Sequence, residues 1–260
     1  ERRLLITGAS RGIGRATALR MASPGTRLAL CGSSHMDELA ETVRLAEARG
    51  ASCLALRGDL TDPAVPAGLV GRAADAFGGL DGVVSNAGMS RPASLTALEL
   101  EVWDRLFAVN VRAGWLLAKH AYSALCAGRG SLVMVASMSG LQPYPGMGAY
   151  SPSKAALIML ARQLAQEWAA EGIRVNVVAP GLIRTPLTAA VYADPGRTRA
   201  REALVPMHRI GDPAADVAGV IAFLLGPEAG YITGQTLLAD GGLLDSLQGR
   251  IAGRPGTGEA

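Results

Sequence analysis

Short apolar runs alternate with longer amphipathic stretches along almost the whole chain of 260 residues. This alternation is typical of a parallel sheet whose strands are buried on both faces and whose connections are helices. The apolar runs predict seven strands, at residues 4–7, 27–31, 52–57, 82–85, 131–136, 174–179 and 235–239. The intervening stretches predict helices at residues 12–22, 36–49, 63–77, 100–125, 152–171 and 212–225. We therefore expect the α/β class, with a doubly wound, seven-stranded parallel sheet and helices on both of its faces.

Chain length and composition indicate one domain. A single core can fill 260 residues, and 49% of the residues are apolar whereas 18% are charged, which is far from the composition of a disordered chain. We expect residues 1–244 to form this domain. Residues 245–260 are rich in glycine and lack apolar periodicity, so we expect them to be a flexible tail.

Charge, cysteine and histidine content exclude several classes of function. The net charge is only +3 and the arginines are scattered from Arg2 to Arg254, so the basic stripe of a nucleic-acid-binding protein is missing. The three cysteines and three histidines lack metal-ligand spacing, which predicts neither a disulfide framework nor a metal site. No apolar run reaches the length of about 18 residues that a membrane span needs. We expect a cytoplasmic protein that acts on a small molecule, without nucleic-acid, metal or membrane partners.

A glycine-rich segment at residues 7–14 follows the first predicted strand and opens the first predicted helix. A helix N-terminus in this position can bind the pyrophosphate of a dinucleotide. Gly8 can make the tight turn, Gly12 can let the backbone approach phosphate, and Gly14 can let the helix lie close to the sheet. Glycine-rich turns also occur for backbone reasons alone, but the place of this one after the first strand favours a Rossmann-type dinucleotide site.

The end of the second predicted strand decides between the two nicotinamide cofactors. An acid there would bind the ribose 2′-hydroxyl and repel a 2′-phosphate, but residues 31–34 read Cys-Gly-Ser-Ser. Arg11 is placed to meet a 2′-phosphate, and Ser33 and Ser34 can donate hydrogen bonds to it. The sequence therefore favours NADP(H) over NAD(H). Arg11 could instead be a solvated loop residue, and Asp37 lies close enough downstream to keep NAD(H) open.

Tyr150 and Lys154 lie four residues apart at a predicted helix start, so both side chains project from one face. Pro152 is compatible with this placement only within the first turn of the helix. A free phenol has a pKa of about 10, and a nearby ammonium lowers it by favouring phenolate. Such a pair is more often found on a surface than in a catalytic site. Ser137, thirteen residues before the tyrosine and after the fifth strand, makes the catalytic interpretation the stronger one.

Together these segments resemble the short-chain dehydrogenases/reductases, over residues 7–242. The matching motifs are T-G-A-S-R-G-I-G at residues 7–14, D-L-T at 59–61, S-N-A-G at 85–88, S-M-S-G at 137–140, Y-S-P-S-K at 150–154 and P-G-L-I-R-T at 180–185. The resemblance, with the residues at the second strand, implies that the cofactor is bound by Gly8, Ser10, Arg11, Gly12, Ile13, Gly14, Ser33, Ser34, Asp59, Leu60, Asn86, Ala87, Gly88, Tyr150, Lys154, Pro180, Gly181, Ile183 and Thr185.

The resemblance also implies roles for individual cofactor contacts. Asp59 would lie in the turn that contacts adenine, and backbone near Ile183 with the hydroxyl of Thr185 would hold the nicotinamide carboxamide. Taken from the residues alone, Asp59 could be a helix cap and Asn86 a turn residue. Ser85 stands where the family usually has asparagine, which puts that one side-chain contact in doubt.

The catalytic set implied by the resemblance is Asn110, Ser137, Tyr150 and Lys154. Ser137 would hydrogen-bond the reacting oxygen, and Tyr150 would pass the proton. Lys154 would lower the phenol pKa and bind the nicotinamide ribose. Asn110, a poor helix former in the middle of a predicted helix, would hold a relay water. These roles predict hydride transfer between NADP(H) and the carbon of a secondary alcohol or ketone.

Substrate identity is expected to depend on residues 184–211, a long segment that we interpret as a flexible lid. The opposite wall of the pocket is assigned to Met89, Leu141, Gln142, Tyr144 and Met147. The lid carries basic residues that could attract an anion such as a carboxylate or acyl thioester, or could simply be solvated, namely Arg197, Arg199, Arg201 and Arg209.

Among known members the chain looks most like the 3-oxoacyl-carrier-protein reductases. Glu171 stands where those enzymes commonly have a basic residue, which weakens a carrier-protein substrate. Two alternatives remain beside the NADP(H)-dependent enzyme: an NAD-dependent alcohol or sugar dehydrogenase of the same family, and a catalytically silent NADP-sensing regulator. The presence of all four catalytic residues favours an enzyme. The family's usual interfaces, at residues 231–242 and on the helices at 100–125 and 152–171, imply a homotetramer.

Overall fold

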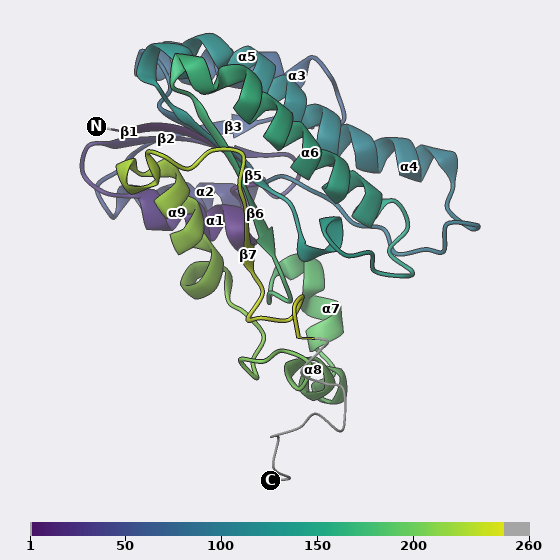
Figure 1. Ribbon diagram of the computed structural model, residues 1–260. Coiled ribbons are helices and arrows are strands. Elements are labelled where there is room, and N and C mark those ends of the chain that lie inside the picture. Colours follow the sequence, from purple (N-terminus) through teal and green to yellow (C-terminus); the bar gives the residue numbers. More distant parts are fainter. Residues whose placement is uncertain (1, 247–260) are drawn as a thin grey trace.

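The computed structural model describes residues 2–246 of the chain (Figure 1). Its strands are β1 (Arg2–Thr7), β2 (Thr26–Gly32), β3 (Ser52–Arg57), β4 (Gly82–Ser85), β5 (Ser131–Val135), β6 (Arg174–Pro180) and β7 (Thr236–Ala239). Its helices are α1 (Gly12–Met21), α2 (Met36–Glu47), α3 (Val65–Phe77), α4 (Leu100–Phe107), α5 (Ala113–Gly128), α6 (Tyr150–Trp168), α7 (Ala189–Tyr192), α8 (Pro195–Glu202) and α9 (Ala218–Leu225). Most of the tail expected at 245–260 lies outside the described residues.

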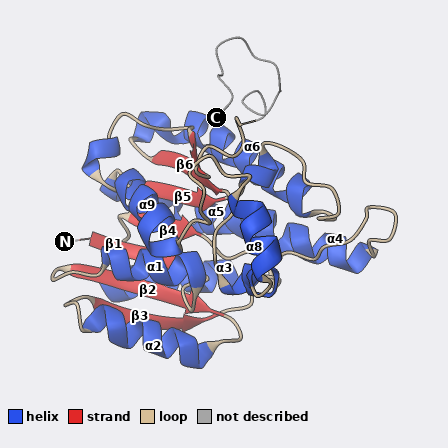
Figure 2. Cartoon of the chain, turned by 90° about the horizontal axis from the view of Figure 1, so that it is seen from below, coloured by secondary structure: helices blue, strands red, loops and turns tan. Residues whose placement is uncertain are grey.

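The seven strands form one sheet in the order β3-β2-β1-β4-β5-β6-β7, and every pair of neighbours is parallel. Helices α3, α5 and α6 cover one face, whereas α1, α2 and α9 cover the other (Figure 1). Turned by 90°, the labelled strands follow one another from β3 to β6 in the order of the sheet (Figure 2). The predicted doubly wound, seven-stranded architecture is therefore confirmed.

Alternating strand residues fill two separate hydrophobic cores, one on each face of the sheet. On β1, Leu5 belongs to one core, whereas Leu4 and Ile6 belong to the other. On β4, Val83 and Val84 divide in the same way. Successive side chains of a strand point to opposite faces, so strands buried on both faces need apolar residues at nearly every position. This requirement explains why the strands appear in the sequence as unbroken apolar runs.

The helix expected at 100–125 is broken by a π-helical turn at Ala108–Arg112, between α4 and α5. In this turn the Ala113 N–H donates to the Ala108 carbonyl, five residues earlier. Single π-turns inside helices often mark functional sites, and Asn110 lies at the centre of this one. Helix α6 begins at Tyr150, which places Pro152 in the first turn as predicted.

The segment at 184–211, expected to be a flexible lid, contains regular structure. Helices α7 and α8 lie within it, and the Asp194 carboxylate caps α8 by accepting hydrogen bonds from the backbone N–H groups of Gly196 and Arg197. The N-cap position favours aspartate because its side chain satisfies amide groups that have no partner inside the helix. Among the described residues, every helix is too short or too polar to span a bilayer.

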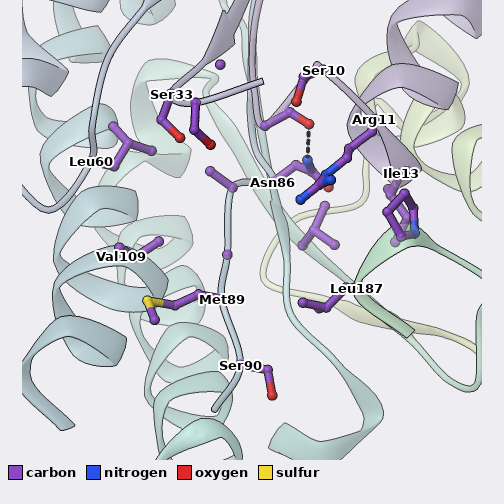
Figure 3. Close-up of a pocket in the computed structure, with 18 of the residues that line it drawn as sticks. Ser10, Arg11, Ile13, Ser33, Leu60, Asn86, Met89, Ser90, Val109 and Leu187 are labelled. Atoms are coloured by element: carbon purple, nitrogen blue, oxygen red, sulfur yellow. Dashed lines mark hydrogen bonds between the residues drawn. The ribbon is translucent and has the colours of Figure 1, made fainter. Parts of the chain in front are cut away.

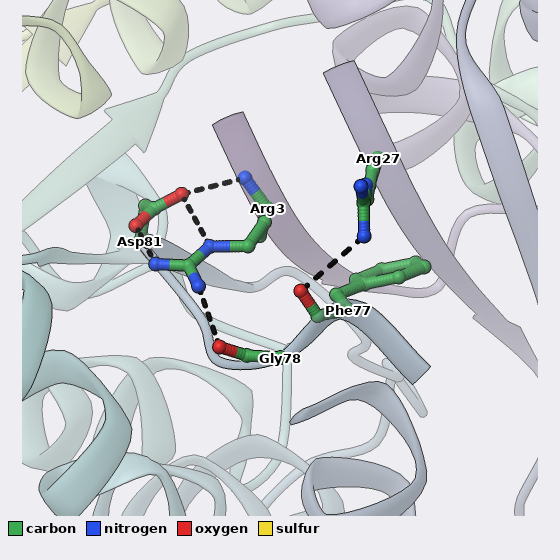
Figure 4. Close-up of polar contacts among 5 residues, drawn as sticks. All are labelled: Arg3, Arg27, Phe77, Gly78 and Asp81. Carbon is green, nitrogen blue, oxygen red and sulfur yellow. Dashed lines mark hydrogen bonds and ion pairs between the residues drawn. The ribbon is translucent and has the colours of Figure 1, made fainter. Parts of the chain in front are cut away.

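At the amino end of the sheet, Arg3 on β1 is joined to Asp81, the residue before β4 (Figure 4). The guanidinium donates to both carboxylate oxygens at 3.0 and 2.6 Å, and the Arg3 backbone N–H donates to the same carboxylate at 2.8 Å. Partial burial acts to raise the pKa of Asp81, but these hydrogen bonds hold it below its usual value. The contact ties β1 to the turn that enters β4, its neighbour in the sheet.

We expect Asp81→Asn to lower the free energy of unfolding at pH 7 by about 1.5–3 kcal/mol, the range for hydrogen bonds to charged groups. Because the pKa of the folded carboxyl is depressed, its stabilisation exists above the unfolded pKa of about 4 and is lost as pH falls through the folded pKa. The difference in free energy of unfolding between the unmodified protein and Asp81→Asn should therefore shrink below about pH 4. Urea unfolding followed by tryptophan fluorescence measures both effects.

Asp75→Asn, on the exposed side of α3, is the matched control and should leave stability unchanged at both pH values. Equal stability of Asp81→Asn and the unmodified protein at pH 7 would contradict the assignment.

Candidate active site

A cavity of about 480 Å³ lies at the carboxyl edge of the sheet, where the loops after β1, β2, β3 and β4 meet (Figure 3). Most of the residues predicted to bind the cofactor line it. They are Gly8, Ser10, Arg11, Gly12, Ile13, Ser33, Ser34, Asp59, Leu60, Asn86, Ala87, Gly88, Tyr150, Lys154 and Thr185. The cavity therefore joins the glycine-rich turn to the tyrosine and lysine of α6.

The glycine-rich turn takes a shape that other residues would not allow. Gly8 and Gly12 have φ angles of +65° and +58°, in the left-handed region that glycine adopts without a steric penalty. Gly14 does not line the cavity, but a Cβ there would collide with the carbonyl oxygen of Gly8. Its role is therefore the predicted one of letting α1 lie close to the end of β1.

Thr7 joins the turn after β1 to the turn after β4. Its hydroxyl accepts hydrogen bonds from the backbone N–H groups of Asn86 and Ala87 at 3.0 and 3.1 Å. The Asn86 amide in turn donates to the carbonyls of Thr7 and Gly8 at 2.9 and 3.2 Å. Asn86 thus fixes the glycine-rich turn through its side chain, whereas a simple turn residue would shape only its own turn. Thr7 was not predicted as a site residue, although its position at the end of β1 was a usable signal.

The end of β2 holds Ser33 and Ser34 at the cavity, together with Arg11. An acid is also present, but it is Glu38 rather than the expected Asp37. The Glu38 carboxylate lies 3.7 Å from the guanidinium of Arg11 and 3.4 Å from Nδ1 of His35. Helical periodicity explains the difference, because Glu38 turns toward the glycine turn whereas Asp37 is exposed on α2.

Asp59 caps its own turn while it lines the cavity. Its carboxylate accepts the backbone N–H of Thr61 at 3.0 Å, and hydrogen bonds from Thr61 hold the pKa of Asp59 below its usual value. Asp59 is therefore not a helix cap, because the N-cap of α3 is Ala64, and its bond within the turn is compatible with a cofactor contact. Leu60 lies beside it in the wall of the cavity (Figure 3).

Lys154 carries a buried ammonium next to the cavity. The residue is 4% exposed, and its Nζ donates to the carbonyl of Val135, the last residue of β5, at 2.9 Å. Burial lowers the pKa of Lys154 to about 8, because low-dielectric surroundings disfavour the charged form. A Cβ at position 88 would lie 3.3 Å from Nζ, so Gly88 leaves room for the ammonium.

Tyr150 lies beside this ammonium, whose Nζ is 5.7 Å from the centre of the phenol ring. Burial raises the pKa of Tyr150 above its usual value, and a hydrogen bond with Ser137 opposes that rise. This differs from the expectation that Lys154 lowers the phenol pKa. The reason is that desolvation of the phenol outweighs the polar contact it makes. Ser137 itself is buried at the N-cap of a short 3-10 helix that follows β5.

Asn110 is 2% exposed and its side chain is fully engaged. Its Oδ1 accepts the Met89 backbone N–H at 2.9 Å, and its Nδ2 donates to the Met89 carbonyl and to Ser153 Oγ, both at 3.0 Å. Asn110 therefore fastens the loop after β4 to the start of α6. A relay water would have to use the remaining lone pair or the backbone of the π-turn, because both amide hydrogens are occupied.

Besides Gly14, three predicted cofactor residues do not line the cavity: Pro180, Gly181 and Ile183. Pro180 ends β6, a Cβ on Gly181 would collide with Asp240, and Ile183 forms a bridge with Gly211 that buries its side chain elsewhere. Only backbone near Ile183 can therefore serve the predicted role, whereas Thr185 does reach the cavity.

Of the expected substrate wall, only Met89 lines the cavity itself. Leu141, Gln142 and Tyr144 are exposed on the loop before α6, and Met147 pairs with Ala93 in an isolated bridge. Met89 and Ser90 lie toward the same end of the cavity as Leu187 from the 184–211 segment (Figure 3). Substrate could approach Tyr150 at this end.

The site can move a proton but shows no metal chemistry of its own. Within residues 2–246, no group of three or more His, Cys, Asp or Glu side chains is placed to hold a metal ion. A phenol, a hydroxyl and a buried ammonium, at Tyr150, Ser137 and Lys154, are the groups available to a reacting oxygen. Proton transfer by a positioned side chain is the chemistry that this set supports.

Comparison with known proteins gives a consistent set of relatives. A family model described as Enoyl-(Acyl carrier protein) reductase matches residues 8–244. Glucose 1-dehydrogenase of Gluconobacter oxydans is 37% identical, over 93% of this chain and 91% of that protein. Cis-4-hydroxycyclohexanecarboxylate dehydrogenase of Sinomonas cyclohexanicum is 39% identical, over 93% of this chain and 96% of that protein.

A solved structure agrees with the sequence comparisons. A short chain dehydrogenase from Burkholderia cenocepacia, in complex with NADP, superimposes with a TM-score of 0.86 and 37% identity, and covers 93% of this chain and 97% of that chain. Identity at this level over nearly the full length, together with the same sheet, is far beyond a likeness of fold alone. The chain belongs to the short-chain dehydrogenase/reductase family of oxidoreductases.

Proposed function

We propose that the protein is an NADP(H)-dependent oxidoreductase that interconverts a secondary alcohol and a ketone, with Tyr150 as proton donor and acceptor. The observation that carries the proposal is that Tyr150 and Lys154, whose ammonium lies 5.7 Å from the centre of the phenol ring, line one cavity together with the glycine-rich turn. Residues 1–244 would form the single dinucleotide-binding and catalytic domain.

The cavity fits a dinucleotide on the evidence of its own residues. Left-handed glycines at positions 8 and 12 bring backbone close to the N-terminus of α1, where partial positive charge and free N–H groups favour phosphate. Gly88 leaves Lys154 Nζ open toward the same cavity. A bound nicotinamide cofactor would supply the hydride, which no side chain can provide.

The pKa of each catalytic group suits its proposed task. Because burial raises the pKa of Tyr150, the phenol is protonated at neutral pH and can give its proton to the oxygen of a ketone under reduction. Ser137 can donate to that oxygen while the charge develops, and the Lys154 ammonium can stabilise the phenolate that remains. Lys154 loses its own charge near pH 8, so its effect should weaken above that pH.

Cofactor choice is proposed from Arg11, Ser33 and Ser34, which line the cavity near the end of β2. A guanidinium and two hydroxyls favour a 2′-phosphate, and the Burkholderia cenocepacia relative is solved with NADP. Glu38 is the observation that favours the second candidate, an NAD-dependent dehydrogenase. Its carboxylate lies 3.7 Å from Arg11 and would oppose a phosphate unless the arginine turns away from it.

The substrate is proposed to be a ring-bearing secondary alcohol or its ketone. Two relatives are named for glucose and for cis-4-hydroxycyclohexanecarboxylate, and both of these compounds carry a hydroxyl on a ring. A catalytically silent regulator is disfavoured because Asn110, Ser137, Tyr150 and Lys154 are all present. We further propose a cytoplasmic homotetramer, supported by Trp115 and Met159, large apolar side chains exposed on α5 and α6.

We predict that NADPH binds more tightly than NADH and that Arg11 is responsible. Arg11→Ala should weaken NADPH binding by about 10- to 100-fold, which corresponds to the 1.5–3 kcal/mol of a charge-assisted hydrogen bond, and leave NADH nearly unaffected. Glu38→Gln should have the opposite effect on NADPH affinity: because it removes the carboxylate that opposes the phosphate, NADPH should bind several-fold more tightly. Fluorescence titration of both cofactors into all three proteins makes the comparison. Equal affinities in the unmodified protein would refute the choice of NADP(H).

We also predict that Tyr150→Phe lowers ketone reduction by about a hundredfold or more, the usual contribution of a positioned acid or base. The ring is kept, so NADPH affinity should hardly change. Tyr122→Phe, which removes a hydroxyl from a ring packed against Trp168, is the matched control and should remain active. Retained turnover in Tyr150→Phe, measured by loss of NADPH absorbance with a panel of cyclic ketones, would reject the proton-donor role.

A further inference from the structure

We propose that Arg184 and Arg201, on the segment whose residues Thr185 and Leu187 line the cavity, form an anion subsite, so that the substrate is an alcohol or ketone that carries a carboxylate. The inference rests on the proposed function, because it assigns a substrate class to the same site. It depends on three features of the 184–211 segment: how its arginines pair, which aromatic rings they contact, and where they lie relative to Tyr150.

Among residues 2–246, Arg184 and Arg201 have no carboxylate partner, unlike Arg197 and Arg209 of the same segment. Arg197 lies 3.5 Å from the carboxylate of Asp194, and Arg209 donates to both oxygens of Asp216 at 2.6 Å. Within the described part of the chain, neither Arg184 nor Arg201 lies within ion-pair distance of an acid. Their positive charge is therefore available to a ligand.

Both guanidinium groups are instead held by one aromatic ring. The central carbon of Arg184 lies 5.2 Å from the centre of the Tyr192 ring, and that of Arg201 lies 5.7 Å from it. Cation–π contacts of this kind fix the orientation of a guanidinium without neutralising it. Two like charges near one ring repel each other, and an anion that contacts both would offset that repulsion.

Tyr192 adds a polar group without a partner. The residue is 7% exposed, and its hydroxyl has no hydrogen-bond partner among the described residues. A buried hydroxyl without a partner is costly, and this one belongs to the residue whose ring holds the two cations. A carboxylate oxygen that enters beside the ring would accept its hydrogen bond.

The cluster lies between the lid and the catalytic segment. Arg201 Nη2 donates to the hydroxyl of Tyr144 at 3.3 Å, and Tyr144 belongs to the loop that joins Ser137 to Tyr150. Arg184 immediately precedes Thr185, which lines the cavity. The cluster therefore joins the segment that lines the cavity at Thr185 to the loop that leads to Tyr150.

Apolar side chains lie on both segments that carry this cluster. Leu141, on the loop before α6, and Leu187, which lines the cavity, are both exposed large apolar residues. A ligand body that contacts these side chains would be apolar, whereas its charged end would contact the arginines. Arginine recognises carboxylates through a planar pair of N–H donors, so the chemistry of the site points to an apolar ring or chain ending in a carboxylate.

Isothermal calorimetry on the NADPH-bound protein tests the subsite without any turnover. The probes are cyclohexanecarboxylate and its uncharged counterpart cyclohexanecarboxamide. The carboxylate should bind about tenfold or more tightly than the amide, as expected for charge-assisted hydrogen bonds. Arg201→Gln and Arg184→Gln should each remove most of that preference while affinity for the amide stays the same. Tyr150→Phe should keep the preference, because the subsite does not depend on proton transfer.

Arg197→Gln is the control, since it removes the same charge from the same helix but from an arginine already paired with Asp194. It should leave the preference for the carboxylate intact. The subsite is refuted if the carboxylate and the amide bind with equal affinity, or if neither binds to the NADPH complex. It is also refuted if Arg197→Gln reduces the preference for the carboxylate as strongly as Arg201→Gln does. A protein that binds no NADPH at all would instead refute the proposed function.

Discussion

The buried ammonium of Lys154 is the constraint around which the carboxyl edge of the sheet is built. Its Nζ has the Val135 carbonyl as acceptor at 2.9 Å and lies beside the bare backbone of Gly88. A buried charge is costly unless it is hydrogen-bonded, so β5, α6 and the turn after β4 must meet at fixed distances. The same geometry sets Tyr150 beside Lys154, and Asn110 locks the loop after β4 onto the start of α6.

Desolvation acts on both titrating groups of this site, in opposite directions. It raises the pKa of the Tyr150 phenol and lowers the pKa of the Lys154 ammonium to about 8, because it disfavours the charged form of each. The two pKa values are thereby moved apart, because free tyrosine and free lysine titrate close together, at about 10 and 10.4. At neutral pH the phenol therefore keeps its proton, and it can donate this proton to a ketone oxygen.

Local patterns were sufficient to predict the sheet, its helices and most of the cavity lining, because buried strands and glycine turns leave signals within a few residues. The π-turn at Ala108–Arg112 was missed, since helical periodicity does not register one extra residue. Thr7, Glu38 and Tyr192 were also missed. Each acts through a partner distant in the chain or on a neighbouring turn of helix, and the amino-acid sequence does not pair such residues. The unequal pairing of the lid arginines is likewise a tertiary property.

The most direct test of this account is the pKa of Lys154 itself. The chain contains only two lysines, Lys119 and Lys154, so protein labelled with isotope at lysine Cε gives two signals in an NMR pH titration, and Lys119→Arg assigns them. The account predicts that the Lys154 signal titrates near pH 8, well below the value of about 10.4 for a free lysine. A Lys154 signal that titrates at or above 10.4 would contradict a buried, desolvated ammonium as the centre of the site.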